Sequence, residues 1–218
     1  MKIKNVIFAL DGTLLDTTEG VLESVKYTIR TLKYPELPHD ELLTFIGPPI
    51  QNSFASHYGC DIENAQKAAE IFRDYYKNKA LLLAKPYDGI YELCEGLQKE
   101  GICMAVATYK REDYALTLLR HFHFDTYCNP MHGADHKNKL KKEDIVLMCQ
   151  TEMRGTKENS VLIGDTIHDA KGAHEAQIPF IAVTYGFGFK STNDCDDYPH
   201  IGVASSPLDV LRLIDEIQ

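Results

Sequence analysis

The chain has 218 residues, a formal net charge of −9 and a hydrophobic content of 44%. This length suits either one full core or a core domain with a smaller inserted domain. The acidic balance argues against nucleic acid or an anionic membrane as a partner, because positive charge gathers only in the segment 137–142. No apolar stretch approaches the roughly 18 residues of a membrane helix, so we expect no membrane partner.

The six cysteines are widely spaced and form no CxxC motif, and several lie in apolar runs. Buried free thiols in a reducing cytosol are the simplest interpretation of this pattern. The chain enters a candidate strand within its first residues, which leaves no room for a signal peptide. We therefore expect a cytoplasmic protein, either a monomer or a weak homodimer.

Strand-like and helix-like patterns alternate along most of the chain, at intervals of about 20 to 40 residues. The candidate strands cover residues 3–9, 102–107, 160–164 and 180–184, with a weaker one near 125–129. This alternation predicts an α/β fold whose mostly parallel sheet is covered on both faces. The exception is the stretch 16–84, which shows only helical periodicity. We expect a core formed by 1–15 and 85–218, with an α-helical domain formed by 16–84 inserted into it.

The first strand leads directly into a polar turn. Residues 7–16 read IFALDGTLLD, so the apolar run ends at Asp11, Gly12 and Thr13. A buried strand that turns sharply at small polar residues can bring them to a ligand. Within the helical stretch, Gly47 and Pro48 begin a stiff Gly-Pro-Pro loop with exposed amides. This loop is either a substrate-facing loop or a plain turn between helices.

The second candidate strand, 102–107, is followed directly by Thr108, Tyr109 and Lys110. In open α/β sheets ligands bind beyond the carboxyl ends of the strands, where a hydroxyl and the following amides can donate to a phosphoryl oxygen. Taken alone, Thr108 would be interpreted first as a turn residue or a helix cap, since Thr is common at such strand ends. A lysine-rich run precedes the next helix, and Lys142 and Lys139 are both candidates for a cation at the site.

The strand 160–164 ends in Gly-Asp, and Asp165 is followed four residues later by Asp169. Oxygen ligands of this kind suit Mg²⁺, which is commonly held by one or two carboxylates together with waters and a substrate phosphate. A simple helix N-cap is the alternative role for Asp169. After the last strand, residues 185–189 read YGFGF, and we interpret them as a packing loop, with contact to substrate as the alternative.

These motifs, in this order and over essentially the whole chain, resemble those of the haloacid dehalogenase-like (HAD) hydrolases. The phosphoglycolate-phosphatase-like subgroup with a helical cap is the most similar. The resemblance implies a Rossmann-like core with a helical cap, Mg²⁺ as the cofactor and a small phosphorylated metabolite as the substrate. Phosphoglycolate-like acids and nucleoside monophosphates both fit, so the substrate stays open.

The resemblance also implies roles for the residues at the strand ends. Asp11 would be the general acid and base, and its carbonyl would bind the metal together with Asp165. Asp169 would bind a metal-bound water or Lys142, which we favour over Lys139 as the site lysine. The residues implied in substrate binding are Gly12, Thr13, Thr108, Tyr109, Lys110, Gly47 and Pro48.

One position departs from the family pattern. Ala9 stands where the family has the nucleophilic Asp that forms an aspartyl-phosphate, and a methyl group cannot attack phosphorus. Three accounts compete: an engineered replacement, a natural phosphate-binding pseudoenzyme, and a sequence error. We favour the first, because an idle site has no physical reason to keep its other like charges together. A 5'-nucleotidase-like or phosphomutase-like activity is the alternative to a phosphoglycolate-phosphatase-like one.

Overall fold

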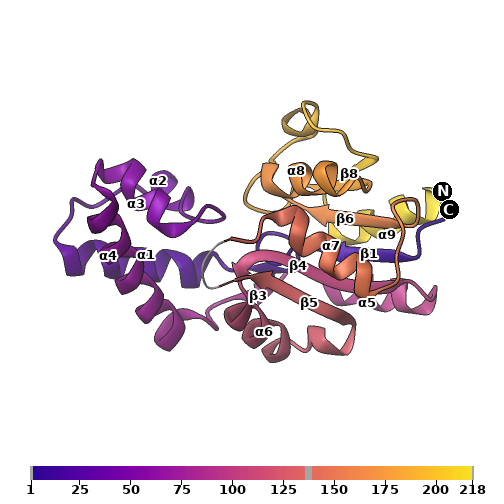
Figure 1. Ribbon diagram of the computed structural model, residues 1–218, viewed down its shortest axis with the longest axis horizontal. Helices are drawn as coiled ribbons and strands as arrows, with labels where there is room; N and C mark the ends of the chain where they lie inside the picture. Colours follow the sequence, from indigo (N-terminus) through magenta and orange to yellow (C-terminus); the bar gives the residue numbers. More distant parts are fainter. Residues whose placement is uncertain (1, 136–138, 218) are drawn as a thin grey trace. The chain divides into compact units, whose positions relative to one another are not determined.

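The computed structural model describes residues 2–135 and 139–217 (Figure 1). The chain divides into two compact units, which we call the core unit and the helical unit. The core unit comprises Met1–Asp16 and Pro86–Gln218, and the helical unit comprises Thr17–Lys85. The short strands β2 (Leu15–Asp16) and β3 (Lys85–Pro86) lie where the chain passes from one unit to the other.

The core unit is built on a six-stranded sheet in the order β5-β4-β1-β6-β7-β8. Its strands are β1 (Asn5–Phe8), β4 (Cys103–Arg111), β5 (Cys128–Ala134), β6 (Ser160–Gly164), β7 (Phe180–Val183) and β8 (Gly202–Ala204). Every neighbouring pair in this sheet is parallel. The predicted α/β fold with a mostly parallel sheet is therefore confirmed.

The two central pairings bring three strand ends together. In β1, Asn5 pairs with Cys103 of β4 on one side and with Ser160 of β6 on the other. All four residues of β1 are buried, as expected for a strand covered on both faces. Because the three strands run in parallel and in register, the residues that follow them meet at one edge of the sheet.

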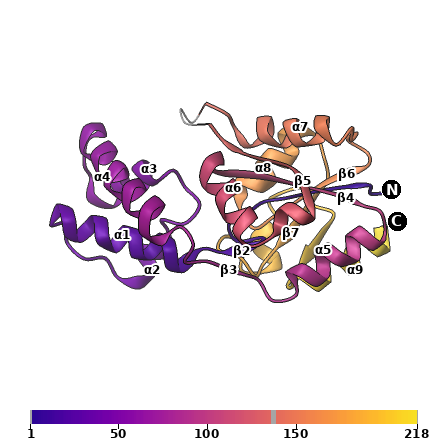
Figure 2. The same ribbon diagram turned by 90° about the horizontal axis from the view of Figure 1, so that it is seen from below.

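Helices cover both faces of the sheet. They are α5 (Ile90–Lys99), α6 (Glu112–His121), α7 (Lys142–Glu152), α8 (Ile167–Ala176) and α9 (Pro207–Ile217). Figure 2 shows α7 and α8 on one side of the sheet and α5 and α9 on the other. Buried alanines are frequent on both sides of this contact, with Ala105 and Ala107 in β4 and Ala170 and Ala173 in α8, and these small side chains allow the helices to approach the strands closely.

Two predicted strands have wrong boundaries, and one strand was not predicted. The weaker strand near 125–129 starts later, because a short 3₁₀ turn, Phe124–Thr126, precedes β5. The strand predicted at 102–107 continues to Arg111. The strand β8 was missed, because three residues that include a glycine give no measurable periodicity.

The helical unit consists of α1 (Thr18–Leu32), α2 (His39–Leu43), α3 (Ile50–Tyr58), α4 (Ile62–Tyr75) and a π-helical turn at Tyr76–Ala80. α4 packs against both α1 and α3. The contact buries the apolar stripe of α1, which includes Val25 and Ile29, and that of α4, which includes Ala68 and Phe72.

None of the helices within residues 2–135 and 139–217 is long and apolar enough to cross a membrane. Over the same residues all six cysteines are free thiols, and Cys94, Cys128, Cys149 and Cys195 are buried.

Candidate active site

The turn after β1 is packed directly against Asp165. Gly12 has φ 75°, a conformation that glycine adopts at little cost, and its amide donates to the carbonyl of Leu15 at 2.9 Å. A Cβ at Gly12 would lie 2.1 Å from Oδ2 of Asp165, so any larger residue would force this carboxylate to move. The buried Thr13 faces the same carboxylate, and its hydroxyl lies 3.5 Å from Oδ1 of Asp165.

Ala9 lies at the centre of this edge. It follows β1, is 3% exposed, and its amide donates to the carbonyl of Ile163 in β6 at 2.9 Å. The backbone is thus held by the sheet, while the side chain is a methyl group that can neither bind a cation nor attack phosphorus. The structure therefore places Ala9, the predicted nucleophile position, where the ends of β1 and β6 meet.

Asp165 is completely buried and has no cation beside it among the described contacts. Its Oδ2 accepts hydrogen bonds from the amides of Phe187 at 2.7 Å and Gly188 at 3.2 Å. Burial, and then the negative charge of Asp169, raise the pKa of Asp165 to about 7. A buried carboxylate in this state is a favourable place for a cation.

Lys142 and Asp169 form a buried ion pair. Nζ of Lys142 lies 2.6 Å from Oδ1 of Asp169 and also donates to the carbonyl of Ala107 at 2.7 Å. The other oxygen of Asp169 accepts from the amide and hydroxyl of Thr166, at 3.0 and 2.7 Å. Thr166 is the N-cap of α8, and Asp169 completes its capping box. With both carboxylate oxygens engaged, Asp169 is placed to orient Lys142 rather than to bind a metal directly.

The structure therefore places Lys142, the first residue of α7, with the acidic residues of the site. Lys139 is exposed, and its amide donates to Oδ1 of Asp135 at 2.7 Å. Lys137, another member of the lysine run, lies outside the described residues.

Thr108, Tyr109 and Lys110 lie in an irregular part of β4, not after its end as predicted. Ala107 pairs with His132 of β5 and Arg111 with Ala134, so three residues of β4 oppose a single residue of β5. Such a bulge re-aims side chains at the rim of a sheet. Here Thr108 is buried and accepts from the amide of Lys110 at 3.0 Å.

The side chains of this bulge contact two other predicted site residues. Nζ of Lys110 lies 3.0 Å from Oδ1 of Asp11, so the candidate acid and base has a cation beside it. The hydroxyl oxygen of Tyr109 accepts from the amide of Lys142 at 3.0 Å and thereby satisfies the start of α7. Tyr109 was predicted as a substrate-binding residue, and in the structure its hydroxyl has this local role.

Gly47 and Pro48 belong to the helical unit, where they lie in the loop between α2 and α3. Gly47 has φ 104°, which again favours glycine, and a Cβ there would meet nothing within 4 Å. The loop is thus a conformationally restricted turn with open space at Gly47.

Sequence reasoning missed the main contribution of the loop after β7. Its backbone amides hold Asp165, and the hydroxyl of Tyr185 donates to the carbonyl of Thr13 at 3.1 Å. Nearly every residue has a backbone amide, so a contribution made by amides cannot be recognised from the side chains in a sequence. The only available signal was the alternation of Gly186 and Gly188 with aromatic residues, beside a strand end.

The donor set fits Mg²⁺ only in part. Within residues 2–135 and 139–217, no three His, Cys, Asp or Glu side chains gather to hold a metal. Mg²⁺ nevertheless needs only one or two carboxylates, with waters and a substrate phosphate supplying further oxygens. Asp165 offers a buried carboxylate with one oxygen loosely engaged, and Asp11 offers a main-chain carbonyl. Ala9 removes the carboxylate that the family pattern would add.

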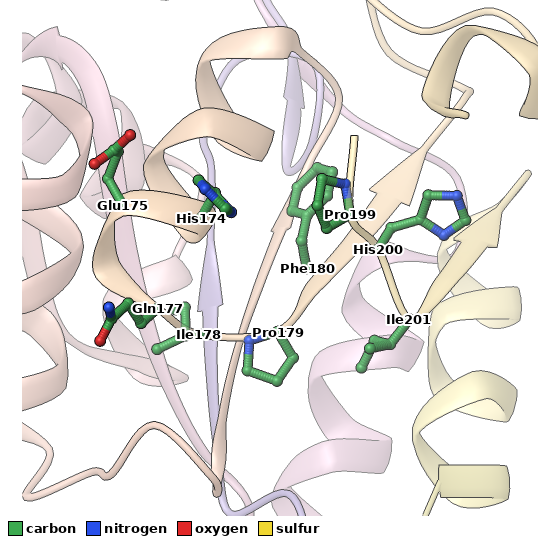
Figure 3. Close-up of a pocket in the computed structure, with 9 residues that line it drawn as sticks. All are labelled: His174, Glu175, Gln177, Ile178, Pro179, Phe180, Pro199, His200 and Ile201. Carbon is green, nitrogen blue, oxygen red and sulfur yellow. The ribbon is translucent and has the colours of Figure 1, made fainter. Parts of the chain in front are cut away.

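A separate hollow of about 430 Å³ lies at the opposite edge of the sheet (Figure 3). Its lining includes residues just before β7 and β8, at the amino ends of these strands, together with the end of α8. His174 and His200 both line it, and Figure 3 shows Phe180 and Pro199 drawn between them. Since the predicted site residues of the core unit lie at the carboxyl ends, this hollow is not the candidate site.

Comparisons with known proteins agree with the fold described above. A 5'-nucleotidase from Pseudomonas aeruginosa is 33% identical over 189 residues, which are 86% of each chain. The tyrosine-protein kinase PtkA of Mycobacterium tuberculosis is 32% identical over 84% of this chain, which spans only 62% of that protein. The crystal structure of a predicted phosphatase from Clostridium acetobutylicum has a TM-score of 0.90 and 33% identity, covering 99% of this chain and 100% of the other.

The family model that matches is described as haloacid dehalogenase-like hydrolase and covers residues 6–183. This range starts in β1 and ends in β7, so it contains every predicted site residue from Ala9 to Asp169. The chain belongs to the haloacid dehalogenase-like hydrolases.

Proposed function

We propose that this scaffold is a Mg²⁺-dependent phosphomonoester hydrolase that works through an aspartyl-phosphate, and that Ala9 makes the present chain an inactivated form. The observation that carries the proposal is the arrangement around Ala9. A candidate acid and base, Asp11, follows β1; a buried carboxylate, Asp165, follows β6; and a buried lysine, Lys142, contacts the carbonyl of Ala107 in the neighbouring strand β4. The remaining machinery for phosphoryl transfer is therefore present around a position that lacks its nucleophile.

With Asp at position 9, a carboxylate oxygen would attack phosphorus, and the bond between phosphorus and the ester oxygen would break. Asp11 would donate a proton to the leaving oxygen and then accept one from the attacking water. That water would cleave the aspartyl-phosphate, which releases phosphate and restores the carboxylate. Bound Mg²⁺ would supply charge neutralisation for the phosphoryl oxygens.

The other residues of the site would bind and orient the phosphoryl group. Lys142, fixed by Asp169 and the carbonyl of Ala107, would bring a positive charge that the fold already holds in place. The hydroxyl of Thr108 would donate to one phosphoryl oxygen. Lys110 would stabilise negative charge near Asp11, 3.0 Å away.

We infer that the substrate is a small phosphorylated metabolite, and that a nucleoside monophosphate is the first class to test. The similarity to a 5'-nucleotidase over 86% of the chain supports this class over a phosphoglycolate-like acid. Gly47 and Pro48 are our candidates for substrate contact from the helical unit. A natural phosphate-binding protein without turnover is the alternative function, because Ala9 prevents covalent catalysis while the other phosphate-binding groups remain.

The test is to compare three proteins: the chain as it stands, Ala9→Asp and Ala9→Asn. Only Ala9→Asp supplies a nucleophile, and losing a nucleophile from a site that acts as a unit costs roughly 10⁴-fold or more in rate. We expect hydrolysis of p-nitrophenyl phosphate and of a nucleoside monophosphate panel by Ala9→Asp alone, and only with Mg²⁺. Comparable rates for the three proteins would contradict the role of position 9.

A further inference from the structure

Two aromatic side chains, Tyr109 and His168, meet beside the candidate site, and the roles described above do not use their rings. The ring of Tyr109, in the bulge of β4, packs edge-on against the imidazole of His168, with ring centroids 5.6 Å apart and an interplanar angle of 79°. We call these two residues the aromatic pair. Tyr109 is 39% exposed and His168 is also exposed, so neither ring is covered by its partner. The aromatic pair therefore offers ring surface to a ligand.

The order of the strands shows where the aromatic pair lies. Tyr109 belongs to β4, and His168 belongs to the first turn of α8, which follows β6. In the sheet, β1 lies between β4 and β6. The contact between the two rings therefore passes beside the end of β1, on the side of the sheet where α7 and α8 pack (Figure 2). The aromatic pair forms one wall of the candidate site.

Each ring of the aromatic pair is attached to a segment that also carries a candidate phosphate-binding or positioning residue. Tyr109 directly follows Thr108, and its hydroxyl accepts from the amide of Lys142 at 3.0 Å. His168 directly precedes Asp169, whose Oδ1 lies 2.6 Å from Nζ of Lys142. A phosphate bound by Thr108 and Lys142 can therefore bring the group that it carries against the two rings.

We propose that the aromatic pair, Tyr109 and His168, stacks on the base of a nucleoside monophosphate and so selects nucleotides over small phosphorylated acids. The proposal rests on the proposed function, which brings a phosphomonoester to this site. Nucleobases stack on tyrosine and histidine rings, and every base has a face that can do so. A phosphoglycolate-like acid has no planar ring to place there. The aromatic pair therefore discriminates by the group attached to the phosphate, and we expect little preference among the bases.

The chain as it stands suits a binding test, because without a nucleophile at position 9 it should not consume its ligand. Calorimetry in the presence of Mg²⁺ compares adenosine monophosphate, ribose 5-phosphate, phenyl phosphate and inorganic phosphate. We expect adenosine monophosphate to bind about fivefold or more tightly than ribose 5-phosphate, which is the smaller end of what stacking one base on an aromatic side chain contributes. Equal affinities for these two ligands would overturn the proposal. Phenyl phosphate binding as tightly as adenosine monophosphate would overturn the nucleotide as the ligand class.

Substitutions in the aromatic pair separate stacking from structural effects. We expect His168→Ala to weaken binding of adenosine monophosphate about fivefold or more and to leave binding of inorganic phosphate unchanged. Tyr109→Leu and Tyr109→Phe both lose the hydroxyl at the start of α7, but only Tyr109→Leu loses the ring, so only Tyr109→Leu should lose the preference for adenosine monophosphate over ribose 5-phosphate. His174→Ala, at an exposed position later in α8, is the matched control. Unchanged nucleotide binding in His168→Ala and Tyr109→Leu would overturn the proposal, and so would an equal loss of nucleotide and inorganic phosphate binding.

The outcome for the aromatic pair can be told apart from the outcome for the proposed function. The Ala9→Asp protein is assayed in parallel for hydrolysis of p-nitrophenyl phosphate with Mg²⁺. Hydrolysis by Ala9→Asp without any preference for adenosine monophosphate refutes the role of the aromatic pair alone. If Ala9→Asp hydrolyses no phosphomonoester and the chain as it stands binds none of the four ligands, the proposed function fails as well.

Discussion

Asp165→Asn tests whether the buried carboxylate destabilises the protein when no cation is present. The pKa of Asp165 is raised from its usual 3.8 to about 7, first by burial and then by the charge of Asp169. Between pH 3.8 and about pH 7, Asp165 keeps its proton in the folded protein, whereas in the unfolded chain it has released it. The unfolded state then binds fewer protons, so the free energy of unfolding falls as the pH rises from about 4 to about 7 and levels off above that.

The size of the effect follows from the pKa change. A change in the pKa from 3.8 to about 7 corresponds to roughly 4 kcal/mol at about 1.36 kcal/mol per pKa unit. The Asn side chain keeps a carbonyl oxygen that can accept from the amides of Phe187 and Gly188. We therefore expect the Asp165→Asn protein to be more stable than the parent by a few kcal/mol at pH 8, and similar to it at pH 4.

The assay is urea unfolding of parent and variant at several pH values in EDTA. The difference between the two proteins isolates Asp165 from the other titrating groups. Asp169→Asn is the control with the opposite sign, because it leaves Lys142 as a buried ammonium without its carboxylate and should cost about 3 to 5 kcal/mol. If the parent and the Asp165→Asn protein show parallel stability profiles from pH 4 to pH 8, the assignment of a destabilising carboxylate is wrong.

Two further predictions concern the charges around position 9. In the Ala9→Asp background, Lys110→Met should lower kcat, because it removes the cation 3.0 Å from Asp11; an unaltered kcat would contradict this role. The chain as it stands should bind inorganic phosphate in EDTA more tightly than Ala9→Asp does, since a second like charge about 4 Å from the phosphate costs on the order of 1 to 4 kcal/mol. Calorimetry with phosphate measures the difference, and tighter binding by Ala9→Asp would be inconsistent with it.

The strand ends at the centre of the sheet could be predicted because the pattern is simple there. Apolar runs end abruptly at Asp11 and Asp165, and parallel strands place such ends at one edge of a sheet. The sequence also indicated that a lysine before α7 would join this edge. It could not decide between Lys142 and Lys139, because the decision depends on Asp169 and the carbonyl of Ala107, which come from other parts of the chain.

Two features of the site could not be predicted for physical reasons. The bulge in β4 is a change of register with β5, and neither strand alone specifies how many residues oppose each other. The loop Tyr185–Phe189 contributes through backbone amides, which every residue except proline possesses. The alternating glycines become informative only once Asp165 is known to lie beside them, because only then does the need to exclude a Cβ appear.

The charges that remain around Ala9 bear on how this chain came to carry an alanine. Lys142 and Asp169 are both almost fully buried, and removing either partner would leave a costly unpaired charge, so this pair persists for stability alone. Asp165 is different, because its buried carboxylate has no countercharge in the described structure and destabilises the fold at neutral pH unless a cation binds. A site long without function would gain stability by replacing Asp165 with a neutral residue. Its presence therefore favours a replacement at position 9 of an otherwise working metal site over a long-established loss of activity.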